Sequence, residues 1–154
     1  MQGALAARVI GISDGDTLTL LDARTQVKVR LANIDAPEKR QAYGAAARAS
    51  LAELCFGKQA SISVAARDRY GRTVATVNCE GVDANREQVR RGLAWVYDQY
   101  NKDRSLPALE QQARIARRGL WADQASQPPW EFRRKKKGAG AKKHQRRDEG
   151  WFGF

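Results

Sequence analysis

Three short clusters of carboxylate and guanidinium side chains hold the residues of this sequence that are best suited to chemistry. They are Asp14-Gly15-Asp16-Thr17, the stretch from Arg30 to Glu38, and Asp68-Arg69-Tyr70-Gly71-Arg72. Carboxylate oxygens hold a hard divalent cation, a further carboxylate can take a proton from water, and guanidinium groups make paired hydrogen bonds to phosphate oxygens. Together these abilities are what the metal-assisted cutting of a phosphodiester requires.

Each residue type suits a different task. Asp16 and Asp35 are the predicted side-chain ligands of the cation, helped by a backbone carbonyl next to Asp35 and by water. Glu38 is placed to accept a proton from an attacking water or to orient that water. Arg30 and Arg72 can bind phosphate oxygens, and these hydrogen bonds should tighten as charge builds in the transition state. Because the clusters contain neither cysteine nor histidine, Ca²⁺ or Mg²⁺ fits them better than zinc.

Taken one at a time, the clusters have ordinary structural interpretations. Asp14-Gly15-Asp16 is typical of a hairpin turn, and the segment from Asp35 to Glu38 resembles any loop that leaves a strand. The cluster that ends at Arg72 could be an exposed turn. Their joint occurrence favours the functional interpretation, because all of them fall at strand ends or in turns. In a barrel such ends can meet at one mouth.

The first third of the chain predicts three consecutive antiparallel strands, at residues 8–12, 17–20 and 27–31. The period-two alternation places Asp16 on the same face as Leu18 and Leu20, which is the apolar face. Arg30 shares the opposite face with Lys28. We therefore expect the Asp16 carboxylate to need a partner, since an unpaired buried charge is costly.

The rest of the pattern predicts two more strands and three helices. The strands are expected at residues 60–64 and 73–77, and the helices at 44–55, 83–91 and 105–118. Gly57, Gly92 and Gly119 follow the helices and favour their termination. The resulting order, βββαββαα, predicts an α+β fold built on a closed five-stranded antiparallel β-barrel with three α-helices.

Length and charge predict one domain followed by a tail. The chain of 154 residues carries a net charge of +11, and nine lysines and arginines against two acidic residues lie after residue 132. We expect a folded domain at residues 1–132 and a basic, disordered tail at 133–154, with residues 127–130 extended and packed back on the domain. The basic excess indicates a polyanionic partner. No apolar run is long enough to span a membrane.

The two cysteines and the N-terminus leave the compartment open. Cys55 and Cys79 do not form a C-x-x-C pair, so a zinc site is not indicated, and either one disulfide or two buried thiols remains possible. The first residues lack the basic and apolar regions of an intact signal peptide, but a chain whose leader had been removed would look the same. A secreted or periplasmic location is our expectation, with a cytoplasmic one still open.

The three clusters together resemble the staphylococcal nuclease (thermonuclease) family over about residues 7–132. The motifs D-G-D-T, R-x4-D-x-P-E and D-[KR]-Y-G-R occur in family order and with family-like spacing. The resemblance implies an OB-type barrel. It also implies Ca²⁺-dependent hydrolysis of both DNA and RNA, with a preference for single strands and with 3′-phosphate ends as products.

Site residues follow from the resemblance position by position. It implies that the cation is bound by the side chains of Asp16 and Asp35 and by the carbonyl oxygen of Ala36, where well-known members carry threonine. Asp14 matches an acidic residue near the cation. The catalytic residues that it implies are Arg30, Glu38 and Arg72.

The substrate-binding residues align less closely with the family. The resemblance implies contacts from Asp68, Arg69, Tyr70, Tyr97 and Tyr100. Arg69 stands where lysine is common, and the loop from Glu38 to Tyr43 is shorter than in well-known members. Tyr100 is the better match for a tyrosine that stacks on a base and Tyr97 the second, although either could be a core residue at a helix end.

Other classes of function remain open at this stage. A catalytically inactive nucleic-acid-binding or peptide-binding module of the same fold is the first alternative, but such modules usually lose the carboxylates and arginines that are all present here. In the second, the basic tail grips DNA and the barrel is only a scaffold. DNA and RNA are the expected substrates. A monomer is the expected oligomeric state.

Overall fold

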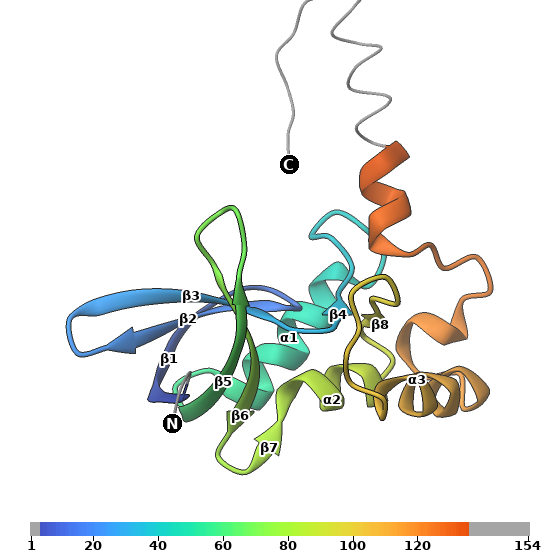
Figure 1. Cartoon of the computed structure of the whole chain (residues 1–154). Helices are drawn as coiled ribbons and strands as arrows, with labels where there is room; N and C mark the ends of the chain where they lie inside the picture. The colour runs from blue at the N-terminus through green and yellow to red at the C-terminus, as the bar shows by residue number, and fades with distance from the viewer. Residues whose placement is uncertain (1–3, 136–154) are drawn as a thin grey trace, which may run out of the picture.

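The computed structural model describes residues 4–135 of the chain and shows a closed β-barrel of OB type flanked by helices (Figure 1). Strand order in the main sheet is β3-β2-β1-β5-β6-β7, and a further pairing of β3 with β6 closes the barrel. The main strands are β1 (Ala4–Asp14), β2 (Thr17–Asp22), β3 (Thr25–Leu31), β5 (Gln59–Arg67) and β6 (Thr73–Cys79). The predicted α+β barrel is confirmed.

One detail of the barrel differs from the prediction. All sequential pairs are antiparallel, but β3 and β6 pair in parallel, through Val29↔Thr73, Arg30↔Val74 and Leu31↔Ala75. The barrel is therefore mixed rather than wholly antiparallel. Two register shifts in β1 and one in β5 bend these strands, as bulges do in closed barrels.

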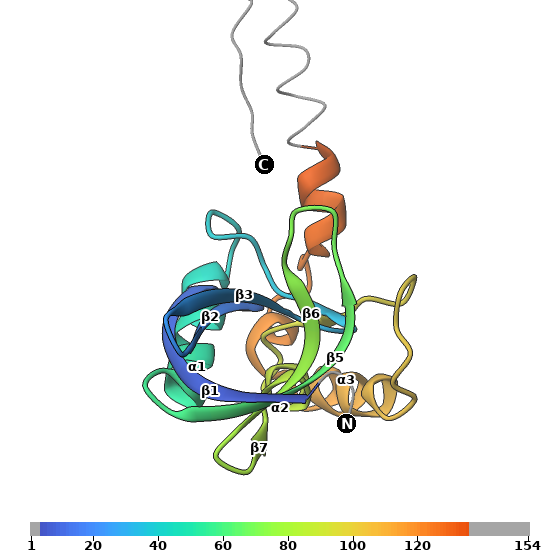
Figure 2. The same cartoon turned by 60° about the vertical axis from the view of Figure 1, so that its left-hand side comes forward.

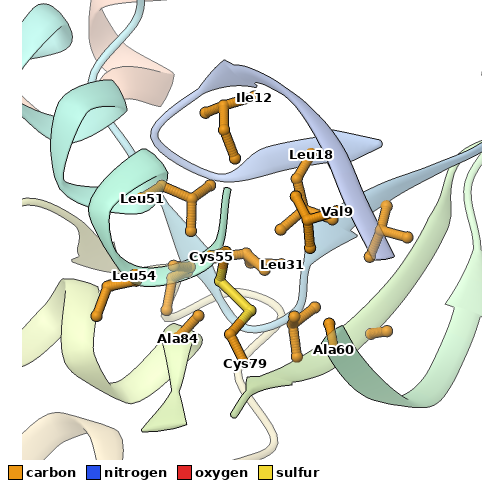
Figure 3. Close-up of a cluster of buried hydrophobic side chains, with 14 of the residues drawn as sticks. Val9, Ile12, Leu18, Leu31, Leu51, Leu54, Cys55, Ala60, Cys79 and Ala84 are labelled. Carbon is orange, nitrogen blue, oxygen red and sulfur yellow. A yellow bond between two sulfur atoms is a disulfide. The ribbon is translucent and has the colours of Figure 1, made fainter. Parts of the chain in front are cut away.

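The barrel interior and the helices share one hydrophobic core. Buried residues alternate along β6, and Leu18 and Leu20 of β2 are fully buried beside Asp16, as the alternation predicted. Helix α1 (Gly44–Cys55) packs its Leu51 and Leu54 over this core (Figure 3). Helix α2 (Ala84–Arg90) is capped by Asp83, whose carboxylate accepts a hydrogen bond from the backbone N–H of Arg86.

The remaining elements are short. Strand β4 (Ile34–Asp35) pairs with β8 (Trp95–Val96), β7 (Val82–Asp83) pairs with the end of β6, and a 3-10 helix covers Gly119–Ala122. Helix α3 (Leu106–Ile115) ends three residues earlier than predicted. Arg117 takes a left-handed backbone conformation (φ 56°), and the N–H of Arg118 bonds the carbonyl of Ala113, which is the closing pattern of a Schellman-type cap.

A disulfide joins Cys55 at the end of α1 to Cys79 at the end of β6, with the two Cα atoms 5.3 Å apart (Figure 3). The alternative of two buried thiols is therefore excluded by the structure. Both cysteines are buried in the core, so the bridge fixes α1 against the closing strand of the barrel.

The segment after the 3-10 helix was expected to be extended, but residues 129–135 form a helix instead. Trp130 does pack back on the domain, against Tyr97 and Trp95. Residues 136–154, most of the predicted tail, lie outside the described residues, so the domain boundary at 132 stays a prediction. Between residues 4 and 135 no helix is long and apolar enough to cross a membrane.

Reduction of the disulfide should destabilise the fold without changing its sequence. Loss of this bridge, which joins residues 24 positions apart in the sequence, should lower the free energy of unfolding by about 3 kcal/mol. Urea unfolding of the oxidised protein and of the reduced, alkylated protein measures this difference. Alkylation of two cysteines in the unreduced protein would contradict the bridge.

Candidate active site

Arg30 gathers two buried carboxylates that come from separate parts of the sequence. Its Nη1 lies 3.5 Å from Oδ2 of Asp16, and its Nη2 lies 3.3 Å from Oδ1 of Asp35. The exposed fraction is 5% for Asp16 and 1% for Asp35, so both groups depend on partners within the protein. Nη1 of Arg30 also donates to the carbonyl oxygens of Leu31 and Ile34, each at 2.9 Å, which fixes the guanidinium plane.

The turn between β1 and β2 orients Asp16. Its Oδ2 accepts a hydrogen bond from the N–H of Ala36 at 2.7 Å, and its Oδ1 accepts one from the hydroxyl of Thr17 at 3.1 Å. Asp14 closes the turn by accepting from the N–H of Asp16 at 3.1 Å. Gly15 has to be glycine, because a Cβ there would lie 2.5 Å from the Cβ of Ala47. The turn, α1 and the segment after β4 therefore meet at Asp16.

Gln88 of α2 supports the β1–β2 turn through hydrogen bonds, and this residue was not identified from the sequence. Its fully buried amide donates to the carbonyl oxygen of Gly15 at 2.8 Å and to that of Ala47 at 3.0 Å, and its Oε1 accepts from the hydroxyl of Ser50 at 2.6 Å. The polar residue lies on the inner face of α2, next to the apolar Val89. Among the charged residues Arg86, Glu87 and Arg90, a glutamine of α2 carries no sequence signal of burial.

Electrostatics set the carboxylates apart from ordinary surface acids. Burial raises the pKa of Asp35 to about 6, against a hydrogen bond from Arg133 that lowers it. Burial, followed by the charge of Asp16, raises the pKa of Asp14 to about 7. Burial also opposes ionisation of Asp16, but Arg30 and several hydrogen bonds hold the pKa of Asp16 below its ordinary value. The cluster concentrates negative charge in a place with little water.

This donor set fits a hard cation. All of the candidate ligand atoms are oxygens, and Asp16 and Asp35 are both buried, so their charges depend on partners within the site. Across residues 4–135 no group of three or more histidine, cysteine, aspartate or glutamate side chains could hold a metal ion by itself. Asp16 and Asp35 would thus need further oxygen ligands, such as the carbonyl of Ala36 and water.

Arg72 directly precedes β6, and strand alternation continued to this position would place it on the face of Arg30. Arg30 pairs with Val74 across the parallel β3–β6 junction, and Arg72 precedes Val74 by two residues. The Nε of Arg72 lies 2.7 Å from Oδ2 of Asp68, and Oδ1 of Asp68 accepts hydrogen bonds from the N–H groups of Tyr70 and Arg72. Asp68 thus shapes the turn and holds Arg72. Contacts described for residues 4–135 do not join Arg72 to the carboxylates around Arg30.

Two other predicted substrate residues, Arg69 and Tyr70, lie in the β5–β6 hairpin. The β5–β6 hairpin with Arg69 and Tyr70 projects at the end where the loop after β4 and the helix at 129–135 also lie (Figures 1 and 2). Tyr70 is 69% exposed, with the guanidinium groups of Arg69 and Arg72 over its ring. A hollow of about 190 Å³ beside Glu38 is lined by Asp14, Glu38, Lys39 and Arg40.

The two tyrosines after β8 differ in their surroundings. Tyr97 stacks on Trp130 with a centroid distance of 5.1 Å and an interplanar angle of 3°. Tyr100 contacts the edge of Tyr97 at 4.9 Å and is 60% exposed. The stacking role of either tyrosine stays a prediction, and Trp130 already covers a face of Tyr97.

Arg133 enters the site from the helix at 129–135. Its Nη2 lies 2.6 Å from Oδ2 of Asp35, and its Nη1 lies 2.7 Å from Oε2 of Glu38. This contact was not predicted, because Arg133 opens a run of five basic residues, which is typical of a solvated tail. Its spacing of three from Trp130, which allows both to face the domain from one helix, was the available signal.

Comparison with known proteins agrees with the motifs. The family model described as staphylococcal nuclease homologue matches residues 28–123. A protein of Escherichia coli named "Uncharacterized endonuclease" is 45% identical over 130 residues, which cover 84% of this chain and 85% of that protein. The "Micrococcal nuclease" of Shigella flexneri is 40% identical over 142 residues, which cover 85% of this chain and 82% of that protein.

Substitution of Gln88 tests how the turn is supported. Gln88→Leu keeps the volume but leaves the carbonyl oxygens of Gly15 and Ala47 without their buried donor, and we expect it to lower the free energy of unfolding by about 3 kcal/mol. Gln111→Leu, at an exposed position of α3, should change it by less than about 0.5 kcal/mol. Urea unfolding of both variants measures this, and equal effects would contradict the role of Gln88.

Proposed function

Because this chain belongs to the staphylococcal nuclease family and is a nuclease, we propose that it hydrolyses DNA and RNA with Ca²⁺ held by Asp16, Asp35 and the carbonyl oxygen of Ala36. One observation carries this proposal: Arg30 joins two buried carboxylates, one from the β1–β2 turn and one from β4. Oxygen ligands in a poorly hydrated site suit a hard cation.

Glu38, Arg30 and Arg72 have different roles in the proposed hydrolysis. When bound, the cation supplies Lewis-acid stabilisation of charge on the phosphate. Glu38, which is partly exposed beside the hollow, orients a water and takes its proton. Arg30 and Arg72 stabilise the charge that develops on the pentacoordinate phosphate.

Substrate contacts extend from this centre along the exposed end of the barrel. We propose that Arg69, Tyr70 and Tyr100 bind the strand, with Asp68 holding Arg72 in place. Aromatic stacking is tolerant of sequence and needs unpaired bases, which supports a preference for single strands. The family resemblance supports 3′-phosphate products.

The compartment and assembly are also proposals. The Cys55–Cys79 disulfide supports an oxidising compartment, since such bridges persist mainly in secreted and periplasmic proteins. We propose a secreted or periplasmic enzyme that acts as a monomer. The basic run after residue 132 would add contacts to nucleic acid that are independent of sequence.

Removal of the cation should abolish cleavage, and loss of one of its ligands should slow cleavage. Single-stranded DNA should be digested in Ca²⁺ and left intact when a chelator is added. Asp35→Asn should lower the rate at a fixed subsaturating Ca²⁺ concentration by about 100-fold, because a charged ligand is lost. Asp22→Asn, at an exposed position of β2, serves as the matched control. Undiminished digestion in excess chelator would sink the metal-dependent mechanism.

Glu38→Gln tests the proton acceptor. The amide keeps the shape of Glu38 but cannot take a proton, so turnover should fall by about 10²-fold or more while the affinity for single-stranded DNA changes little. Glu80→Gln, an exposed change of the same kind, should leave turnover unaltered. Single-turnover kinetics and a binding titration separate the two quantities. Wild-type turnover in Glu38→Gln would remove Glu38 from the mechanism.

A further inference from the structure

The helix at residues 129–135 places two different side chains in the region proposed to bind substrate and cation. Trp130 and Arg133 are three residues apart and therefore lie on one side of the helix. Figures 1 and 2 show this helix in orange at the end of the molecule that also carries the loop after β4. The two side chains contact elements that are distant in sequence.

Arg133 binds two carboxylates that have roles in the proposed reaction, Asp35 as a ligand of the cation and Glu38 as the proton acceptor. Its guanidinium contacts Oδ2 of Asp35 at 2.6 Å, Oδ1 of Asp35 at 3.3 Å and Oε2 of Glu38 at 2.7 Å. Asp35 has an exposed fraction of 1%, so little space is left around its carboxylate oxygens. While the Arg133 guanidinium occupies these oxygens, a metal ion cannot bind to them. Charge-assisted pairs of this kind are among the stronger protein hydrogen bonds.

The second contact covers an aromatic face. Trp130 stacks on Tyr97 and meets Trp95 edge-on at 5.8 Å. A nucleobase that stacked on the same face of Tyr97 would have to displace Trp130. The side chain thus stands where the planar part of a nucleotide could lie, while Arg133 stands at the carboxylates.

Gln41 ties the helix to the loop that carries Glu38. Its Nε2 donates to the carbonyl oxygen of Gln127 at 2.5 Å, and its Oε1 accepts from the N–H of Glu38 at 3.1 Å. The segment before the helix and the backbone of Glu38 therefore share one side chain. Displacement of the helix would also release this contact on the catalytic loop.

We propose that the helix at 129–135 is an internal inhibitor of the active site, in which the Arg133 guanidinium competes with the divalent cation for Asp35 and holds Glu38. This inference rests on the proposed function, since it assigns Asp35 to the cation and Glu38 to the water. The closed form lowers the apparent affinity for the cation by the fraction of molecules that are open. Binding of the cation must in turn favour release of the helix.

Nucleic acid is the partner that would open the site. Arg133 begins the run Arg-Arg-Lys-Lys-Lys, and a polyanion attracts this run while its phosphates offer Arg133 an alternative bidentate partner. A strand that binds near the barrel mouth therefore draws the helix away and exposes the carboxylates to the cation. Substrate and cation then bind with positive coupling.

Titration of the wild type, Arg133→Gln and Arg134→Gln with Ca²⁺ tests the proposal. Isothermal titration calorimetry without nucleic acid should show that Arg133→Gln binds Ca²⁺ roughly tenfold more tightly than the wild type, or better. Arg134→Gln removes the same charge from an exposed neighbour on the same helix, so it measures the long-range effect alone. We expect that effect to be much smaller.

Hydrogen exchange gives a readout that is independent of catalysis. In the absence of Ca²⁺, the amides of residues 130–135 should exchange faster in Arg133→Gln than in Arg134→Gln. In the wild type, saturating Ca²⁺ should accelerate exchange in the same segment. Slower exchange or no change on adding Ca²⁺ would overturn the proposal.

The outcomes of the titration separate this inference from the function beneath it. Equal Ca²⁺ affinity in the two variants, or weaker binding by Arg133→Gln, overturns the inhibitory helix and leaves the Ca²⁺-dependent nuclease standing. Absence of Ca²⁺ binding in all three proteins overturns both. Tighter binding by Arg133→Gln alone, together with faster exchange, supports both.

Discussion

Burial of Asp16 and Asp35 in one site is possible because Arg30 lies between them, and the architecture of the site depends on this interaction. Two carboxylates removed from water each lose several kcal/mol of solvation, which a shared guanidinium and well-aligned N–H groups can offset. The β2–β3 register, which pairs Thr17 with Arg30, places Arg30 beside the Asp16 turn. A slip of one residue would turn Arg30 into the core. The hydrophobic alternation of these strands therefore also sets the electrostatics of the site.

The support for this interaction is polar as well as apolar. Gln88 binds the turn before Asp16, Asn85 binds the backbone of Ala32 and Val77, and Asp68 holds Arg72 in its turn. Each is a side chain that satisfies backbone or charged groups where the regular ladders end. Such contacts are directional, whereas apolar packing is tolerant of small shifts, so they suit a site that needs fixed positions.

Period-two alternation and turn residues are local signals, and they were sufficient for most of the barrel. The structure brings Asp16 and Asp35 to Arg30, but no described contact joins Arg72 to these carboxylates. Contacts that depend on tertiary structure were not readable. Spacing alone could not decide whether Cys55 and Cys79 are bridged, and two-residue strands such as β4 and β8 carry no periodicity. The helix at 129–135 was missed because prolines and a basic run favour an extended or disordered segment, and its packing against Tyr97 is a tertiary effect.

Charge balance explains why one site could accept two different cations in turn. Asp16 and Asp35 both pair with Arg30, whose charge also acts on nearby Asp14, so these three carboxylates share one guanidinium when Arg133 is absent. Arg133 supplies one positive charge and hydrogen bonds to Asp35 and Glu38 at once. A divalent ion held by Asp16 and Asp35 would supply more charge in less space and would not require the hydrogen bond that Arg133 makes to Glu38. In the proposed mechanism the same excess of carboxylates both calls for a cation and allows Arg133, on a nearby helix, to compete with it.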